Sequence, residues 1–208
     1  TTIYDRDGNL IAELHGAENR VPLSSNQIPQ VVKDATVAIE DERFYEHHGV
    51  DFTGVMRAFV TNLRAGGIVQ GGSTITAQLV KNAYLGTERT YTRKLREALL
   101  SWQLEDKWSK DRILTEYLNT VYYGEGAYGI EAAARRYFHK NAKRLTLKEA
   151  ALLASLPRLP SQYSPVSDPK LARERRNIVL DTMASLGYIT EARAERTKAR
   201  KLGVFKEP

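Results

Sequence analysis

The sequence predicts a predominantly α-helical domain. Several stretches after residue 27 repeat their apolar residues at intervals of three and four, which is the period of an amphipathic helix. Only one short N-terminal stretch carries a strand signal, and no internal repeat or low-complexity tract is present. With 208 residues, 42% of them hydrophobic and 27% charged, the chain can form one compact domain, which can divide into two lobes around a cleft.

The N-terminal segment 3–14 is expected to form a small β-hairpin, because the turn signal at residues 5–9 lies between two short apolar runs. A helix is expected next, with Pro29 in its first turn. This helix should carry Glu40 near its C-terminal end, before Gly49 breaks the pattern.

Three later stretches have helical spacing. They are 93–123, as one or two helices, 147–156, which ends at Pro157, and 169–186, which ends at Gly187.

Charge and composition narrow the function. The formal net charge of +6 favours an anionic partner: nucleic acid, an acidic membrane surface or a phosphorylated substrate. The chain has no cysteine, which excludes disulfides and thiolate zinc sites, and its four histidines show no metal-binding spacing. No apolar run is long enough to span a bilayer. Because the sequence opens at Thr1 without a signal peptide, we expect it to be part of a longer protein.

The first candidate site is the acidic segment 40–49. Four carboxylates within seven residues lie beside aromatic side chains, so burial and like-charge coupling are both expected to raise a carboxyl pKa. A raised pKa suits Glu40 to act as a general base near neutral pH. The alternative is a solvated acidic helix end, which is the more common explanation for such a segment on its own.

The second candidate is the segment 71–82. Glycines lead into Ser73 and Thr74, which are good N-cap residues, and free backbone N–H groups at a helix start can bind an anion. Gln78 and Lys81 lie three positions apart and share a helix face. An ordinary capped helix explains the pattern equally well.

The third candidate is the group of Arg93, Lys94 and Glu97 on one helix. A surface ion pair is the usual explanation for such spacing. However, apolar residues surround Glu97 on several sides of the helix, which predicts burial and places Glu97 in the wall of a cleft. These residues are Leu95, Leu99, Leu100, Trp102 and Leu104.

Other motifs carry less weight. Residues 167–170 match the Ser-x-x-Lys pattern of penicillin-reactive enzymes, but they lie in a proline-rich loop and no Lys-Thr-Gly follows. The basic runs 173–176 and 196–201 are most simply solvated helix faces.

Taken together, these segments and their order resemble glycosyltransferase family 51, the peptidoglycan polymerases. Two later segments also match family motifs, and the resemblance covers nearly the whole chain. Ala77 is a departure, because the second motif usually has a glutamine there. The matching residues are Glu40-Asp41-x-x-Phe44-x-x-His47-x-Gly49, Gly72-Ser73-Thr74-Ile75-Thr76-x-Gln78, Arg93-Lys94-x-x-Glu97, Lys110-x-x-Ile113-Leu114-x-x-Tyr117-Leu118-Asn119 and Arg176-Asn177-x-Val179-Leu180-x-x-Met183.

The resemblance implies a lysozyme-like α fold with two lobes. Residues 1–208 would form one glycosyltransferase domain, with a membrane-apposed jaw at roughly 52–92 and a head formed by the remainder. In this family a membrane anchor normally precedes the domain and a transpeptidase domain can follow it, so both are expected outside this chain. The family also implies the outer face of the bacterial cell membrane and inhibition by moenomycin.

The resemblance also implies the chemistry. Glu40 would be the general base for the sugar hydroxyl of lipid II, and Glu97 would assist departure of undecaprenyl pyrophosphate from the growing glycan strand, with inversion to a β-1,4 bond. No metal ligand is assigned, although a divalent cation such as Mg²⁺ or Mn²⁺ could share the task. The expected substrate-binding residues are Asp41, Ser73, Thr74, Gln78, Lys81, Arg89, Arg93 and Lys94.

Two alternatives remain open at this point. A lysozyme-like glycan hydrolase would also use two carboxylates in a helical cleft, but it would not need the cations. A basic nucleic-acid-binding module would explain the charge, but no recognised reading motif is present, so nucleic acid is not an expected partner.

Overall fold

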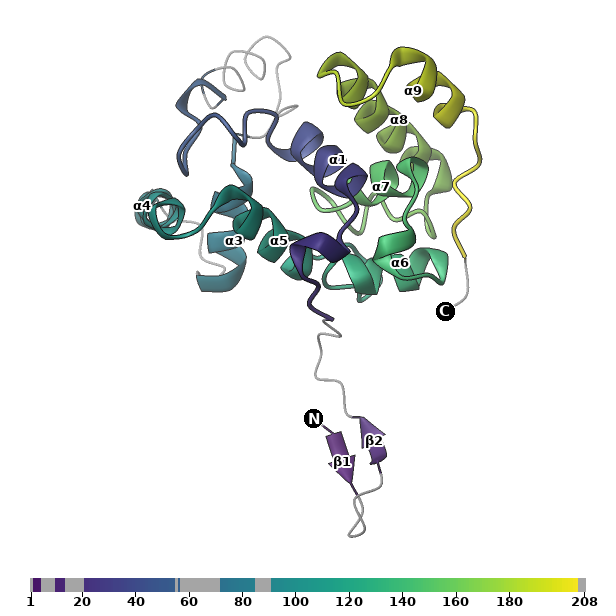
Figure 1. The fold of residues 1–208 in the computed structure, drawn as a ribbon, viewed down its shortest axis with the longest axis horizontal. Coiled ribbons are helices and arrows are strands. Elements are labelled where there is room, and N and C mark those ends of the chain that lie inside the picture. The colour runs from purple at the N-terminus through teal and green to yellow at the C-terminus, as the bar shows by residue number, and fades with distance from the viewer. Residues whose placement is uncertain are drawn as a thin grey trace.

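The computed structural model describes residues 2–4, 10–13, 21–54, 56, 72–84 and 91–205, and helices dominate them, as predicted (Figure 1). In chain order the elements are β1 (Thr2–Tyr4), β2 (Leu10–Glu13), the 3₁₀ turn η1 (Ser25–Gln27), α1 (Gln30–Glu40), α3 (Ile75–Tyr84), α4 (Tyr91–Lys107), α5 (Lys110–Thr120), α6 (Ile130–Phe138), the 3₁₀ turn η2 (Ala142–Arg144), α7 (Leu147–Ala154), α8 (Pro169–Ser185) and α9 (Glu191–Lys198).

Local sequence explains most element boundaries. β1 and β2 pair antiparallel, as the turn signal between them predicted. The stretch 93–123 forms two helices because Ser109 caps the start of α5, where its hydroxyl accepts a hydrogen bond from the Arg112 N–H at 3.3 Å. Helix α6 had no assignment from the sequence, and α9 was indicated only by the basic run 196–201, which was interpreted as a helix face.

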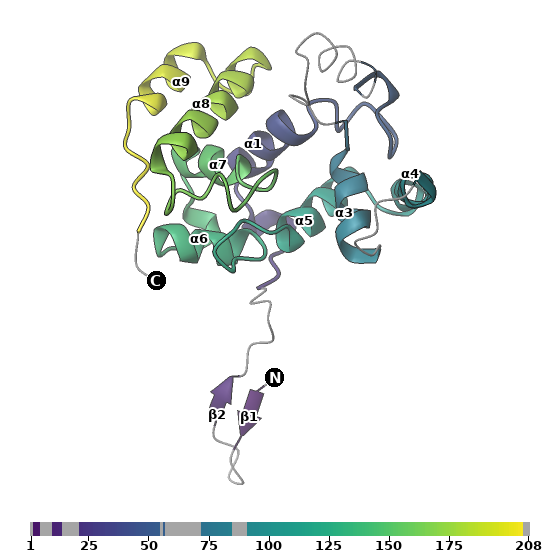
Figure 2. The same cartoon turned by 180° about the vertical axis from the view of Figure 1, so that it is seen from behind.

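Helix α1 lies at the centre of the helical body (Figures 1 and 2). It packs against α7 and α8, while α3 packs against α4 and α5. Glu40 is the last residue of α1, so it projects to where these two groups of helices meet. The core between the elements includes the fully buried side chains of Val32, Val37, Phe44, Ile75, Leu114, Leu118, Leu152, Leu153, Val179 and Leu180.

The prediction that α4 is buried on several sides is wrong. Leu95 and Trp102 are 64% and 53% exposed, and Leu99 is also exposed. Only the side of the helix that carries Glu97 and Ser101 is buried. The helix packs against α3 along that one side, which is sufficient to cover Glu97 and leaves the opposite apolar side open.

The interpretation of the run 173–176 as a solvated helix face is also wrong at one position. Arg176 is fully buried, and its guanidinium donates hydrogen bonds of 2.8 Å to the carbonyls of Lys198 and Arg200. These carbonyls lie at the C-terminal end of α9, where backbone acceptors lack partners within the helix. Arg176 therefore ties α8 to the end of α9.

The predicted jaw lobe falls largely outside the residues that the structure describes. Of the range 52–92, only 52–54, 56, 72–84 and 91–92 are described. The division of the domain into a jaw and a head stays a prediction.

Candidate active site

Glu40 lies in a groove of about 520 Å³ between the two groups of helices. One wall is formed by the segment 72–74 and by residues of α3, and the opposite wall by residues 155–158 and by α8. The groove thus joins parts of the chain that are far apart in sequence. Its position at the end of α1 follows directly from how that central helix is packed.

The environment of Glu40 suits a base. Burial raises the pKa of this carboxyl above that of an ordinary glutamate. The side-chain N–H of Gln78 donates to Glu40 Oε2 at 2.9 Å and lowers the pKa, as do three nearby cations, but burial outweighs all of them. The cations are Arg158, Lys81 and Arg175.

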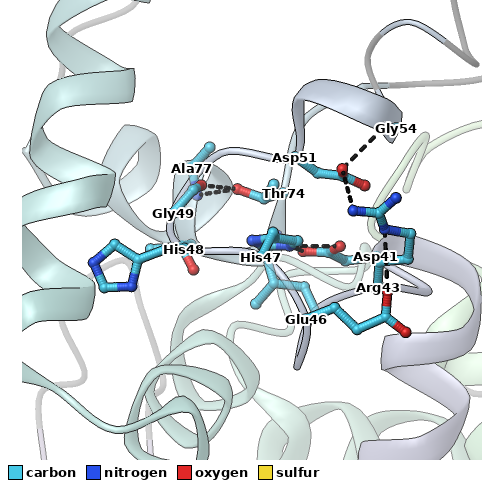
Figure 3. A network of polar contacts seen from close by, with 12 residues as sticks. Asp41, Arg43, Glu46, His47, His48, Gly49, Asp51, Gly54, Thr74 and Ala77 are labelled. Carbon is cyan, nitrogen blue, oxygen red and sulfur yellow. Dashed lines mark hydrogen bonds and ion pairs between the residues drawn. The ribbon is translucent and has the colours of Figure 1, made fainter.

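Like-charge coupling, the other predicted cause of this raised pKa, does not contribute. The neighbouring carboxylates are engaged elsewhere (Figure 3). Asp41 is paired with the ring of His47 at 2.9 Å, and Glu46 with the guanidinium of Arg43 at 3.3 Å. Asp41 and Glu46 therefore each have a partner of their own, and burial is the cause that raises the Glu40 pKa.

The start of α3 is already capped by the protein, contrary to the expected anion site on its free N–H groups. The Ile75 N–H donates to Asp41 Oδ2 at 3.0 Å, and the Ala77 N–H donates to Thr74 Oγ1 at 3.0 Å. The Thr74 hydroxyl donates in turn to the Gly49 carbonyl at 2.7 Å (Figure 3). Asp41 and Thr74 line the groove but are buried, and these contacts hold α1, α3 and the segment between them together.

Gly49 allows this segment to lie directly on α4. Its φ is +74°, a conformation that other residues rarely adopt, and a Cβ here would lie 2.7 Å from the Trp102 backbone nitrogen. The acidic segment therefore needs a glycine at this position to reach its place beside the groove.

Glu97 lies beneath Lys94. Its side chain is 3% exposed, as the predicted position in a cleft wall requires, and Oε1 accepts a hydrogen bond of 2.6 Å from Lys94 Nζ. Lys94 Nζ also lies 3.3 Å from the Ser73 hydroxyl, so the ammonium group bridges α4 and the start of α3. Glu97 Oε2 is buried and has no hydrogen-bond partner among the residues that the structure describes. The outer surface of this pair is therefore positive.

The two proposed carboxylates lie in adjoining hollows. Glu97 and Lys94 line a second cavity of about 350 Å³, which shares the segment 72–74 with the groove of Glu40. Ala77 also lines this second cavity, at the position where the family pattern usually has a glutamine. The segment 72–74 thus lines both the groove of Glu40 and the cavity of Glu97.

The predicted cations occupy different places. Lys81 is exposed and lines the groove, while Arg93 is half-buried on α4. Arg89 lies outside the described residues.

The sequence interpretation missed two cations of the opposite wall, Arg158 and Arg175. The Arg175 guanidinium stacks over the Tyr163 ring at 4.7 Å. The only signal in the local sequence was the basic run 173–176, which contains Arg175 and was interpreted as a solvated helix face.

The described residues do not fit a metal site held by the protein. They contain no group of three or more histidine, aspartate or glutamate side chains that could hold a metal ion. The buried carboxylate of Glu97 is already paired with Lys94. No step of the chemistry is therefore assigned to a metal ion bound by these side chains.

The arrangement of the groove defines a class of protein. A carboxyl with a raised pKa lies in a groove whose two walls carry lysine and arginine side chains. Such a site suits an enzyme that removes a proton from a neutral group next to an anionic part of its substrate.

The chain belongs to the transglycosylase family, whose sequence pattern matches residues 7–184. It is 46% identical over 202 residues to penicillin-binding protein 1F of Bacillus subtilis, covering 97% of this chain and 28% of that protein. It is 47% identical over 205 residues to penicillin-binding protein 1A of Aquifex aeolicus, covering 99% of this chain and 28% of that protein.

A crystal structure of penicillin-binding protein 1A from Haemophilus influenzae matches all of this chain and 21% of that one, with a TM-score of 0.53 and 25% identity. The chain thus spans less than a third of these relatives. The predicted family, the helical fold and the enzyme class, a glycosyltransferase, are confirmed. None of the described helices is long and apolar enough to cross a bilayer.

Proposed function

We propose that this domain polymerises lipid II into β-1,4-linked glycan strands and releases undecaprenyl pyrophosphate. The observation that carries the proposal is the Glu40 carboxyl, which has a raised pKa and is held by Gln78 in a groove with cations on both walls. Transglycosylase membership supports transfer of a glycosyl group, and the relatives' penicillin-binding names support peptidoglycan as its context.

Glu40 is the general base in this proposal. The 4-hydroxyl of the acceptor sugar gives its proton to the carboxylate while its oxygen forms a bond to the anomeric carbon of the donor. The bond from that carbon to the diphosphate breaks, and the electron pair leaves with the diphosphate oxygen. Attack from the face opposite the leaving group converts an α-linked donor into a β-linked product.

Lys94 and Arg93 stabilise the negative charge that develops on the leaving diphosphate, and Lys81 contributes from α3. Glu97 acts mainly through Lys94, because its carboxyl is almost fully covered and holds the ammonium group at 2.6 Å. Arg89 stays a predicted contributor. A divalent cation that takes part would be held chiefly by the diphosphate, since the described side chains provide no cluster for it.

The proposed location is the outer face of the bacterial cell membrane, where lipid II and the growing strand are the partners. The parent protein is proposed to carry an anchor and a transpeptidase domain, because the matched relatives are at least three times longer than this chain. Moenomycin is expected to inhibit the domain, as the family resemblance implies.

The decisive experiment uses labelled lipid II with a divalent cation and separates the glycan products. Glu40→Gln should lower the polymerisation rate by a factor of about 10² to 10⁴, the usual contribution of a positioned base. Glu46→Gln is the matched control, because Glu46 belongs to the same acidic segment but is exposed and paired with Arg43. Near-normal polymerisation by folded Glu40→Gln would contradict the proposal, and release of muropeptides from finished polymer would indicate a hydrolase.

A further inference from the structure

A buried tyrosine stands behind the proposed base. Tyr117, in α5, is 0% exposed, and its hydroxyl lies 3.2 Å from Gln78 Oε1. The amide nitrogen of Gln78 lies 2.9 Å from Glu40 Oε2. These contacts form a chain of two hydrogen bonds that runs from α5 through α3 to the end of α1.

The direction of both hydrogen bonds is fixed by chemistry. An ionised carboxylate only accepts hydrogen bonds, so Gln78 must turn its NH₂ group toward Glu40. The amide oxygen then faces Tyr117, which must donate. Burial and the charge of Glu40 raise the pKa of Tyr117 well above its ordinary range, so the phenol keeps the proton that it donates.

Without the tyrosine hydroxyl, the amide of Gln78 has two comparable orientations. One presents N–H to an ionised Glu40, and the other presents the amide oxygen to a protonated Glu40. The Tyr117 hydroxyl favours the first orientation, because only that orientation gives it an acceptor. It therefore favours the charged form of the base.

We infer that Tyr117 is a positioning residue that fixes the orientation of the Gln78 amide, so that its N–H faces Glu40 and keeps the proposed base ionised at lower pH. Tyr117 does not touch the substrate, since its side chain is fully buried. The inference deepens the proposed function and depends on Glu40 being the base. It adds a residue from α5, a helix that does not line the groove.

Other groups also act on Glu40, and the experiment must keep them constant. Lys81 on α3, Arg158 after α7 and Arg175 on α8 stabilise its charge, while Asp41 follows it directly in the chain. Tyr123 lies close enough for Glu40 to disfavour ionisation of its phenol. None of these five groups takes part in the two described hydrogen bonds that connect Tyr117 to Glu40 through Gln78.

Tyr117→Phe removes the hydroxyl and keeps the buried ring. We expect the acid limb of the kcat/KM profile to move to higher pH, which lowers kcat/KM on that limb by about threefold to tenfold, the effect of one hydrogen bond. On the alkaline plateau the rate should change little. A merely structural role would instead lower the rate equally at all pH values.

The matched control is Tyr123→Phe, which removes a hydroxyl from another fully buried tyrosine near Glu40. Tyr123 takes no part in the hydrogen bonds that join Tyr117 to Glu40, and its own carbonyl accepts from the Tyr137 hydroxyl, so the acid limb should stay in place. Gln78→Ala should also move the acid limb, and adding Tyr117→Phe to it should move the limb no further, because the tyrosine acts only through the amide.

A second measurement separates this inference from the proposed function. Titration of ¹³C-labelled glutamate carboxyls by NMR follows the Glu40 pKa without any turnover, with Glu40→Gln assigning the signal. A higher Glu40 pKa in Tyr117→Phe, with the Tyr123→Phe value unchanged, supports the positioning role even if Glu40→Gln proves active and the proposed base is wrong. An unchanged Glu40 pKa in folded Tyr117→Phe, or an equal shift in Tyr123→Phe, overturns it.

Discussion

Lys94 and Glu97 form an unequal ion pair. The Glu97 side chain is 3% exposed and the Lys94 side chain is 56% exposed, with 2.6 Å between Nζ and Oε1. The buried carboxylate of Glu97 thus fixes the position of Lys94 at the surface of the cavity. This relationship distinguishes the two glutamates of the proposed site, because Glu40 faces its groove directly, whereas Glu97 reaches its cavity mainly through Lys94.

Removing Lys94 should therefore cost stability as well as activity. Lys94→Met leaves a buried carboxylate without its donor, and we expect the free energy of unfolding to fall by about 1–3 kcal/mol. Glu97→Gln should be better tolerated in stability but should lower kcat, because Lys94 loses its anchor. Urea denaturation and lipid II polymerisation measure the two effects. Arg96→Met, at an exposed position of the same helix, is the control, and an equal loss of stability there would contradict the account.

The raised pKa of Glu40 predicts that replacing this carboxyl stabilises the protein, the opposite of the effect expected for Lys94→Met. Because the folded pKa lies above the unfolded one, the folded protein binds more protons between them, and stability falls as pH rises through that window. Glu40→Gln removes the buried charge, so the variant should have a higher Tm than the unsubstituted domain at pH 7. The gain should be about 2–4 °C for each kcal/mol recovered.

Calorimetry of both proteins between pH 4 and pH 8 checks this. The difference in Tm should shrink as the pH falls, since Glu40 is then protonated in the folded protein of its own accord. A Glu40→Gln variant that is less stable than its parent at pH 7 would show that the carboxylate is stabilised by its surroundings and not held at a cost.

The sequence predicted the parts of this site that depend on local pattern. The spacing of apolar residues placed Glu40 at the end of a helix, which is confirmed. The predicted burial of Glu97 is also confirmed, although most of the apolar residues from which it was predicted are exposed. Tyr117 could not be found this way, because its hydroxyl meets Gln78 across 39 positions of the chain. Arg158 and Arg175 were missed for the same reason, since only the packing of α1 against α7 and α8 brings them to Glu40.

Arg176 shows how a charged run can conceal a core residue. Arg176→Lys keeps the charge but cannot place two donors on the carbonyls of Lys198 and Arg200 at once. We expect the free energy of unfolding to fall by about 2–3 kcal/mol, with the specific activity of the folded protein unchanged. Arg173→Lys, on an exposed face of the same helix, should change it by less than about 0.5 kcal/mol. Equal effects of the two substitutions in urea denaturation would contradict the role assigned to Arg176.

Gly49 provides the sharpest test of how the acidic segment is placed. A methyl group at this position would lie 2.7 Å from the Trp102 nitrogen and 2.8 Å from the Ser101 carbonyl carbon, both backbone atoms that cannot rotate away. Gly187 has nearly the same φ, +77° against +74°, but a Cβ there meets no atom within 4 Å. Alanine substitution at the two glycines therefore distinguishes the cost of the backbone conformation, which is present at both, from the cost of close packing, which is present only at Gly49.

Gly187→Ala should cost only the conformational strain, about 1 kcal/mol of unfolding free energy. Gly49→Ala should cost more than twice as much. It should also lower polymerisation by the protein that remains folded, because the acidic segment must move away from α4. That movement would disturb the hydrogen bonds of this segment with the start of α3, from Thr74 to Gly49 and from Ile75 to Asp41. Parallel denaturation and activity measurements on the two variants check this. If they lose the same stability and keep the same activity, the contact of this segment with α4 does not position the site.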